Sequence, residues 1–268
     1  MAKARQIDPR DYILFFLSSV LGLIVITVAT FGIALIPIII GLIMYFYRVR
    51  IALAQLRGSA LKVSSKQFPE IHEYVAELAD AIDMDPPDVY IMESAQQNAF
   101  AAKIGAKKNV VLFDSIVNAA IQLNKPDLLR FIIGHELAHH ALGHTGLIRS
   151  QVSMIYKPLS RSDELSCDAV AAALVGEQAG KEALTLLLIG PHLFPKLNVA
   201  ALDRQALAVE EDRYTKKAEK QMHYPLLLRR IARMIPDEDD AYEEERPSKA
   251  KPKSKPNRYD DEEDDDAR

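Results

Sequence analysis

A long stretch without a single charged residue most constrains how this chain can fold. From Tyr12 to Tyr47, 36 consecutive residues include no Asp, Glu, Lys or Arg. One helix of that length would measure about 54 Å, far more than the roughly 30 Å of a bilayer's hydrocarbon core. Two shorter helices with a turn near Thr30, Phe31 and Gly32 fit that thickness better. The sequence therefore predicts a transmembrane helical hairpin over residues 12–47.

Basic residues flank this hairpin on both sides and predict its orientation. Because Lys and Arg close to a span stay on the cytoplasmic side, both flanks are expected in the cytoplasm, which requires an even number of crossings. Residues 1–11 are then a cytoplasmic N-terminus. The apolar stretch is too long for a cleaved signal peptide and is not followed by a small-residue cleavage site, so we expect it to remain as an anchor. The flanking residues are Lys3, Arg5, Arg10, Arg48, Arg50 and Arg57.

The rest of the sequence divides into a globular domain and a charged tail. Residues 48–235 are enough for one compact domain with its own core. Residues 236–268 contain 14 acidic and 7 basic residues and little to bury. They are predicted to be disordered, and a solvated tail is favoured over a contact with nucleic acid or lipid. The single cysteine, Cys167, excludes an internal disulfide and favours a reducing compartment, and we interpret it as a small buried apolar residue.

The segment His135-Glu136-Leu137-Ala138-His139 carries the strongest chemical signal in the sequence. Histidines four residues apart lie one helical turn above each other, so both imidazoles can reach one Zn²⁺. Glu136 can then take the proton of an attacking water as a peptide bond is hydrolysed. A helix from Pro126 to Leu142 is predicted to carry this motif, with Pro126 in its first turn and Gly143 as its stop.

An acidic pair downstream offers the third protein ligand that zinc needs. Glu164 and Asp168 are four residues apart at the start of a second predicted helix, so their carboxylates share one face. Glu164 can coordinate zinc, and Asp168 can accept the outward ring N–H of a ligand histidine. The alternative is that both are ordinary acidic residues of a first helical turn, where the macrodipole favours negative charge.

The HELAH string and the later segment Ser160–Asp168 together resemble the gluzincin membrane metallopeptidases of the HtpX and CAAX prenyl endopeptidase type, whose pattern is HExxH followed by ExxxD. The resemblance covers roughly residues 69–234. Two further segments resemble the family's Asn-Ala-Phe-Ala stretch and its His-Pro-Pro…Arg element, with Tyr224 in place of the first proline. They contain Asn98, Ala99, Phe100 and Ala101 upstream, and His223, Tyr224, Pro225 and Arg229 downstream.

This resemblance implies roles for individual residues. His135, His139 and Glu164 would bind one zinc ion per chain, and Glu136 would be the general base. His223 would act near the cleft, either as a donor to the oxyanion or as a ligand that keeps the enzyme latent, and a packing role is the alternative. The family's Asn-Ala-Phe-Ala stretch ends in a strand that borders the active-site cleft. Substrate contacts are therefore expected at Asn98, Ala99, Phe100, Ala101 and Arg229.

The fold expected from these segments is mainly α-helical, with a small antiparallel β-sheet next to the zinc helix, as in zincin-like peptidases. The apolar run 183–189 is interpreted as core or as part of the substrate groove. Besides the two zinc-site helices, helices are expected at residues 68–82 and 114–123, and strands at residues 88–94, 99–104 and 110–113, the last two joined by residues 105–109.

These features predict a zinc endopeptidase anchored in the cell membrane by two spans, with its catalytic domain in the cytoplasm. A polypeptide lying along the edge strand near Asn98 would be recognised through its main chain, which suits unfolded or misassembled substrates. The family resemblance adds quality control of membrane proteins as a role. The expected partners are therefore polypeptides and the lipid bilayer, without nucleic acid. The alternatives are an intramembrane protease, against which the charge of Arg130 argues, and a non-proteolytic zinc-bearing adaptor.

Overall fold

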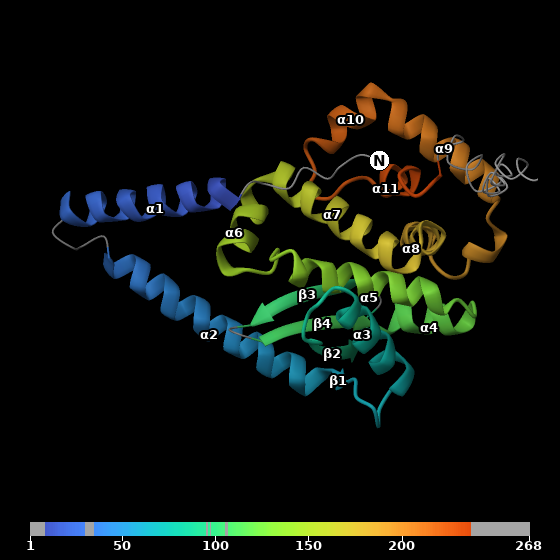
Figure 1. Cartoon of the computed structure of the whole chain (residues 1–268), viewed down its shortest axis with the longest axis horizontal. Coiled ribbons are helices and arrows are strands. Elements are labelled where there is room, and N and C mark those ends of the chain that lie inside the picture. Colours follow the sequence, from blue (N-terminus) through green and yellow to red (C-terminus); the bar gives the residue numbers. More distant parts are fainter. Residues whose placement is uncertain (1–8, 30–34, 95, 97, 105–106, 237–268) are drawn as a thin grey trace, which may run out of the picture. The chain divides into compact units, whose positions relative to one another are not determined.

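The structure is a computed structural model that describes residues 9–29, 35–94, 96, 98–104 and 107–236 (Figure 1). The predicted hairpin turn near Thr30 and the predicted disordered tail fall outside these residues, apart from Pro236. The described part of the chain is mainly helical, and it contains one small sheet. The predicted fold class is confirmed, with a correction to the sheet that is given below.

Two long helices at the N-terminal end contain the described part of the uncharged run. They are α1 (Pro9–Ala29) and α2 (Leu35–Ser59), and their large apolar side chains are exposed along most of their length. By length and composition α2 can cross a membrane, whereas the apolar part of α1, Tyr12–Val28, is shorter. Exposing so much apolar surface to water is unfavourable, which favours a bilayer around these helices. The two predicted crossings stay a prediction.

The sheet is mixed rather than antiparallel as predicted. Its order is β1-β2-β4-β3, in which β2 and β4 are parallel and the other two pairs are antiparallel. The antiparallel prediction was wrong because β3, which lies between β2 and β4 in sequence, takes the outer position and leaves β2 and β4 as neighbours. The strands are β1 (Leu61–Lys62), β2 (Asp88–Met92), β3 (Ala99–Ile104) and β4 (Lys107–Phe113).

Strand β4 begins earlier than predicted. Lys107 pairs with Ile104 and Asn109 with Ala102, so residues 107–109 belong to the strand and not to the connecting loop. Cross-strand pairing extends a strand through polar residues that carry no strand signal of their own. The Asn109 side chain is fully buried, and its amide donates to the carbonyl oxygen of Lys107. The short strand β1 was not predicted.

Helix α5 (Pro126–Ala141) is the centre of the domain. It lies between the sheet on one side and α7 (Lys157–Val175) and α8 (Glu177–Ile189) on the other (Figure 1). Every residue from Phe131 to Ala138 is buried, so α5 lacks an exposed face over this stretch, as expected for a helix enclosed by other elements. The motif histidines are therefore carried by the most enclosed helix of the fold.

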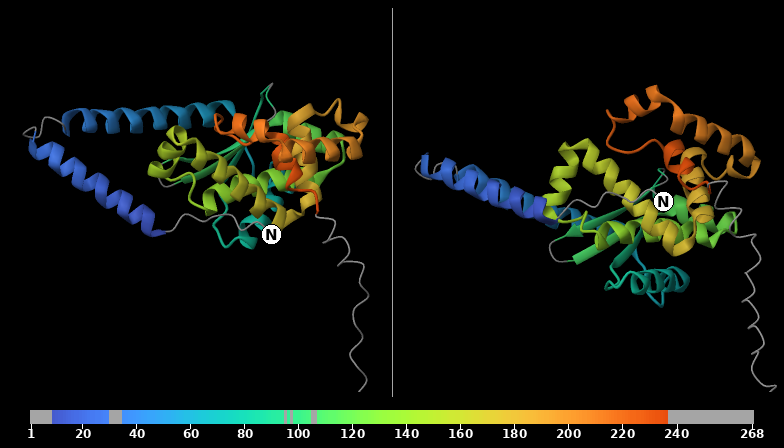
Figure 2. Two further views of the ribbon diagram at one scale, coloured as in Figure 1. Left: turned by 90° about the horizontal axis from the view of Figure 1, so that it is seen from above. Right: turned by 45° about the horizontal axis from the view of Figure 1, so that its top comes forward.

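The remaining helices surround this centre. Helices α3 (Pro69–Ala81) and α4 (Asp114–Gln122) pack against α5 and lie within a residue of their predicted bounds at each end. Helix α11 (Leu227–Ala232) packs against α8 and α9 (Val199–Glu211) (Figure 2). The other elements are α6 (Leu147–Ile155), a 3-10 helix (Phe194–Lys196) and α10 (Arg213–Glu219).

Candidate functional site

Helix α5 brings the two motif histidines together. The ring centroids of His135 and His139 are 5.0 Å apart, and Glu136 beside them is buried. The helix ends at Ala141, one residue before its predicted end, and Gly143 beyond it adopts a φ of +75°, which favours glycine. The chain then turns back, and the amide of His144 donates to the carbonyl oxygen of His139 at 2.9 Å.

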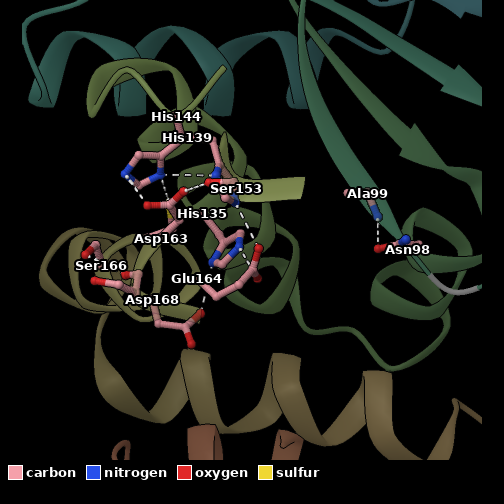
Figure 3. A network of polar contacts seen from close by, with 12 residues as sticks. Asn98, Ala99, His135, His139, His144, Ser153, Asp163, Glu164, Ser166 and Asp168 are labelled. Carbon is pink, nitrogen blue, oxygen red and sulfur yellow. Dashed lines mark hydrogen bonds and ion pairs between the residues drawn. The ribbon is translucent and has the colours of Figure 1, made fainter. Parts of the chain in front are cut away.

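Helix α7 contributes the acidic residue between the two rings. Glu164 Oε2 lies 3.4 Å from His135 Nε2, and its Oε1 lies 3.5 Å from His139 Nε2 (Figure 3). Burial raises the pKa of Glu164, but its hydrogen bonds with the two histidines hold that pKa well below the usual range. The site therefore combines two imidazoles with an ionised carboxylate.

Asp168, one turn further along α7, lies on the outer side of His135. Its Oδ1 is 2.9 Å from His135 Nδ1, as the sequence predicted for an outer partner of a ligand histidine. Arg230 of α11 donates two hydrogen bonds of 2.7 Å to the same carboxylate. Burial raises the pKa of Asp168, but the charge of Arg230 and the contact with His135 lower it overall. Asp168 is therefore held as a carboxylate in one orientation.

Arg230 is a site residue that sequence reasoning missed, and its neighbour Arg229 was expected instead. Arg230 lines the cleft, and its Nη1 is 3.4 Å from Glu164. Arg229 forms ion pairs with Glu210 of α9 and Glu219 of α10 and so ties these helices to α11. Adjacent residues of a helix point about 100° apart, so only one of the two can face the cleft.

A cleft of about 490 Å³ lies over these groups. One wall is the start of β3, where the Asn98 side chain accepts a hydrogen bond of 3.0 Å from the amide of Ala99 (Figure 3). Ala183, Leu184 and Leu187 of the apolar run 183–189 also line the cleft, so this run contributes to both core and cleft. The lining includes Asn98, Ala99, Phe100, Ala101, His135, Glu136, His139, Glu164, Leu184, Leu187 and Arg230.

The loop before α11 brings Tyr224 rather than His223 to the cleft. Tyr224 and Pro225 are lining residues, whereas His223, a half-buried side chain, does not line this cleft. Burial raises the pKa of the Tyr224 phenol, and the carboxylates of Glu164 and Glu136 add to this effect. Tyr224 therefore keeps its proton and can donate a hydrogen bond. The predicted catalytic role of His223 stays a prediction.

Cys167 offers a competing donor near the histidines. Ligand atoms of His135, His139 and Cys167 all lie within 4.8 Å of one another. Burial raises the pKa of the Cys167 thiol well above its usual range, and nearby carboxylates, Glu164 first among them, raise it further. A metal binds thiolate rather than thiol. Two imidazoles and the ionised Glu164 are the donor set of a catalytic zinc site, so the residues at this site fit zinc.

The two other histidines of this region are buried. His140 Nε2 is 3.0 Å from the carbonyl oxygen of Asn109, and its Nδ1 is 2.9 Å from Thr145 Oγ1, which agrees with a structural role. His144 lies against His139. Burial lowers the pKa of each of these two histidines to about 4, so both rings are neutral at physiological pH.

The segment that contains the HExxH motif is similar to a known family of peptidases. Residues 65–155 match the sequence profile described as Peptidase family M48. This segment is similar to M48 peptidases. The predicted resemblance to HtpX-type peptidases is thereby confirmed. The M48 match includes His135, Glu136 and His139 but ends before Glu164, which the fold brings to the same cleft.

Individual relatives extend this match. The protease HtpX homolog of Thermodesulfovibrio yellowstonii is 33% identical over 109 residues, which are 41% of this chain and 36% of that protein. The plastoglobule-localized metallopeptidase 48 of Arabidopsis thaliana is 24% identical over 184 residues, covering 60% of this chain and 53% of that protein. The crystal structure of S. mikatae Ste24p aligns with 74% of this chain and 56% of that one, at a TM-score of 0.48 and 16% identity. This chain thus spans about a third to a half of the length of these curated relatives.

Proposed function

We propose that this protein is a membrane-anchored zinc endopeptidase that cleaves polypeptides. The observation that carries the proposal is the Glu164 carboxylate between the two imidazoles of the HExxH helix, in a cleft that Glu136 also lines. His135, His139 and Glu164 would hold the zinc ion. Zinc bound there would polarise the scissile carbonyl and lower the pKa of the attacking water.

Glu136 is the proposed general base. Burial raises the pKa of this carboxyl above its usual value. A pKa closer to the pH of the reaction suits a group that must first take up a proton and then release it. Glu136 takes a proton from water as the oxygen attacks the carbonyl carbon. The same carboxyl passes this proton to the leaving nitrogen as the carbon–nitrogen bond breaks. Tyr224 is suited to donate a hydrogen bond to the oxyanion that forms between these two steps.

Substrate recognition is proposed along β3. This strand ends the sheet order, and its residues from Ala99 to Ala101 line the cleft, so an extended polypeptide can add to it through main-chain hydrogen bonds. Leu184 and Leu187, which also line the cleft, suit apolar substrate side chains. Because this mode of binding uses the main chain of the substrate, it suits unfolded or misassembled proteins. Membrane proteins as substrates are proposed from the apolar helices α1 and α2.

The test compares metal content with turnover in the full chain purified in detergent. His135→Ala should lose most of its zinc, because three ligands leave no redundancy. Glu136→Gln should keep its zinc and lose digestion of casein. The matched control is Glu177→Gln, at an exposed position of α8, which should keep both properties. A chelator should abolish cleavage by the wild type, and added zinc should restore it.

Each result that differs from these expectations would overturn a different part of the proposal. Stoichiometric zinc in the His135→Ala protein overturns the ligand assignment, and unchanged turnover in Glu136→Gln overturns the base. A wild-type protein that binds zinc and cleaves neither casein nor membrane proteins would support the adaptor alternative. If cleavage is found, proteins that accumulate around the inactive Glu136→Gln variant and are identified by mass spectrometry would name the substrates.

A further inference from the structure

A chain of polar contacts leads from the outer side of His139 to helix α6. His139 Nδ1 lies 3.2 Å from His144 Nδ1, and His144 Nε2 lies 3.5 Å from Asp163 Oδ1 (Figure 3). The Asp163 carboxylate is held by two residues of α6. Ser153 Oγ donates to its Oδ2 at 2.7 Å, and Arg149 donates to its Oδ1. His144 and Asp163 are both buried, so these contacts are shielded from water.

The position of His144 depends on the end of α5. The left-handed conformation of Gly143 turns the chain so that the amide of His144 bonds to the carbonyl oxygen of His139. The two rings then meet edge to face, with centroids 5.3 Å apart and an angle of 73° between their planes. Backbone and ring packing thus hold His144 against the outer nitrogen of His139.

One arrangement of hydrogens satisfies all these contacts. The Nε2 atom of His139 lies toward Glu164, so a metal bound between them would take its lone pair and leave the hydrogen on Nδ1. That hydrogen can be donated to His144 Nδ1, whose ring then carries its own hydrogen on Nε2, toward Asp163. The thiol of Cys167, with Sγ 3.4 Å from His144 Nδ1, shares the same acceptor.

We propose that His144 and Asp163 position His139 for metal binding, and that α6 supports this position through Arg149 and Ser153. The inference rests on the proposed metal site. It gives the second motif histidine the kind of support that Asp168 and Arg230 give to the first. Outer partners of this kind fix the tautomer and the ring orientation of a ligand histidine.

Helix α6 is held in the fold by few apolar contacts. None of its residues is buried, and its apolar side chains at Ile148, Met154 and Ile155 are more than half exposed. The helix therefore contributes little to the apolar core. Arg149 and Ser153 are the side chains by which it reaches Asp163, so a change in α6 should be felt at the metal site.

The test measures the zinc affinity of the full chain in detergent, by competition with a chelator of known affinity. His144→Phe keeps an aromatic ring but removes the acceptor, and it should weaken zinc binding about 10- to 100-fold. His144→Gln retains an acceptor and a donor and should restore most of the affinity. In cobalt-substituted protein, the visible absorption bands of His144→Phe should shift, because they report the ligand field rather than the stability of the fold.

Two serines of α6 provide a matched pair of variants. Ser153→Ala removes a hydrogen bond to Asp163 and should weaken zinc binding in the same direction as His144→Phe, by a smaller factor. Ser150→Ala removes a hydroxyl of the same helix that donates to the carbonyl oxygen of Leu147, and it should bind zinc like the wild type. An equal loss in both serine variants would mean that the general stability of α6 matters and would overturn the proposal.

The outcomes separate this inference from the proposed function. If the wild type binds zinc and His144→Phe and Ser153→Ala bind it equally well, the positioning role is overturned and the zinc site stands. If the wild type binds no zinc, the proposed function falls and this inference falls with it. If the phenylalanine variant does not fold, Ser153→Ala compared with Ser150→Ala tests the same role.

Discussion

Replacing Arg230 with methionine tests how the metal site is held together. Arg230 and Asp168 are both buried and joined by two hydrogen bonds of 2.7 Å. Removing one partner of a buried ion pair costs about 3–5 kcal/mol, because the other charge is left without compensation. Methionine replaces the unbranched stem of arginine and lacks the guanidinium group, so the change removes the charge and the hydrogen bonds while leaving the volume of the stem filled.

The charge of His135 determines how much of the roughly 3–5 kcal/mol the Arg230→Met protein should lose. Burial lowers the pKa of His135, but the carboxylates of Asp168 and Glu164 raise it to about 10. In metal-free protein at pH 7, His135 is therefore protonated and still faces Asp168 when Arg230 is gone. We expect the free energy of unfolding to fall by about 3 kcal/mol, at the lower end of the range for a broken buried pair.

The measurement is urea unfolding of the metal-free chain in detergent micelles, followed by circular dichroism. Arg233→Met, one turn along at an exposed position, is the matched control and should change the free energy of unfolding by at most about 0.5 kcal/mol. Adding Asp168→Asn to Arg230→Met should recover part of the loss, because no uncompensated aspartate remains. A loss below about 1 kcal/mol in Arg230→Met, or an equal loss in Arg233→Met, would refute this reasoning.

Three further outcomes are expected. Gly180→Ala should lower stability by about 1–3 kcal/mol in thermal or urea unfolding, because the added Cβ would lie 2.6 Å from the buried ring of Phe131. His223→Ala should lower turnover with little change in KM if His223 donates to the oxyanion, and should raise basal activity if it is a latch, whereas unchanged kinetics would leave it a packing role. Cysteines introduced at Ala2 and Ser64, with the native cysteine replaced, should both be labelled from the cytoplasmic side, and labelling from opposite sides would mean a single crossing.

Local signals in the sequence determined the helices around the metal site. The predicted helix of residues 126–142 differs from α5 by one residue, because Pro126 begins it and Gly143 ends it. His135 and His139 are four residues apart on this helix, so their rings lie on one face and meet. Caps, prolines and helical periodicity act over one or two turns, so they can be read without knowing what packs against the helix.

The order of the strands depended on contacts that the sequence does not record. Residues 88–94 and 99–104 were predicted as strands, but neither segment contains a signal that β3 takes the outer position and leaves β2 beside β4. Pairing joins residues far apart in the chain, and β-propensity depends on which neighbour a strand meets. The parallel pair could therefore be found only in the folded domain.

Which side chains surround the motif histidines was also decided by the tertiary structure. Arg229 and Arg230 have the same side chain and adjacent positions, and the packing of α11 against α8 and α9 directs Arg230 to Asp168 and Arg229 to Glu210. His144 carries no motif signal, since it approaches His139 only after the chain turns at Gly143. Spacing along a helix specifies a direction around its axis, but the partner found in that direction belongs to another element, and only the packing of the elements decides which residue it is.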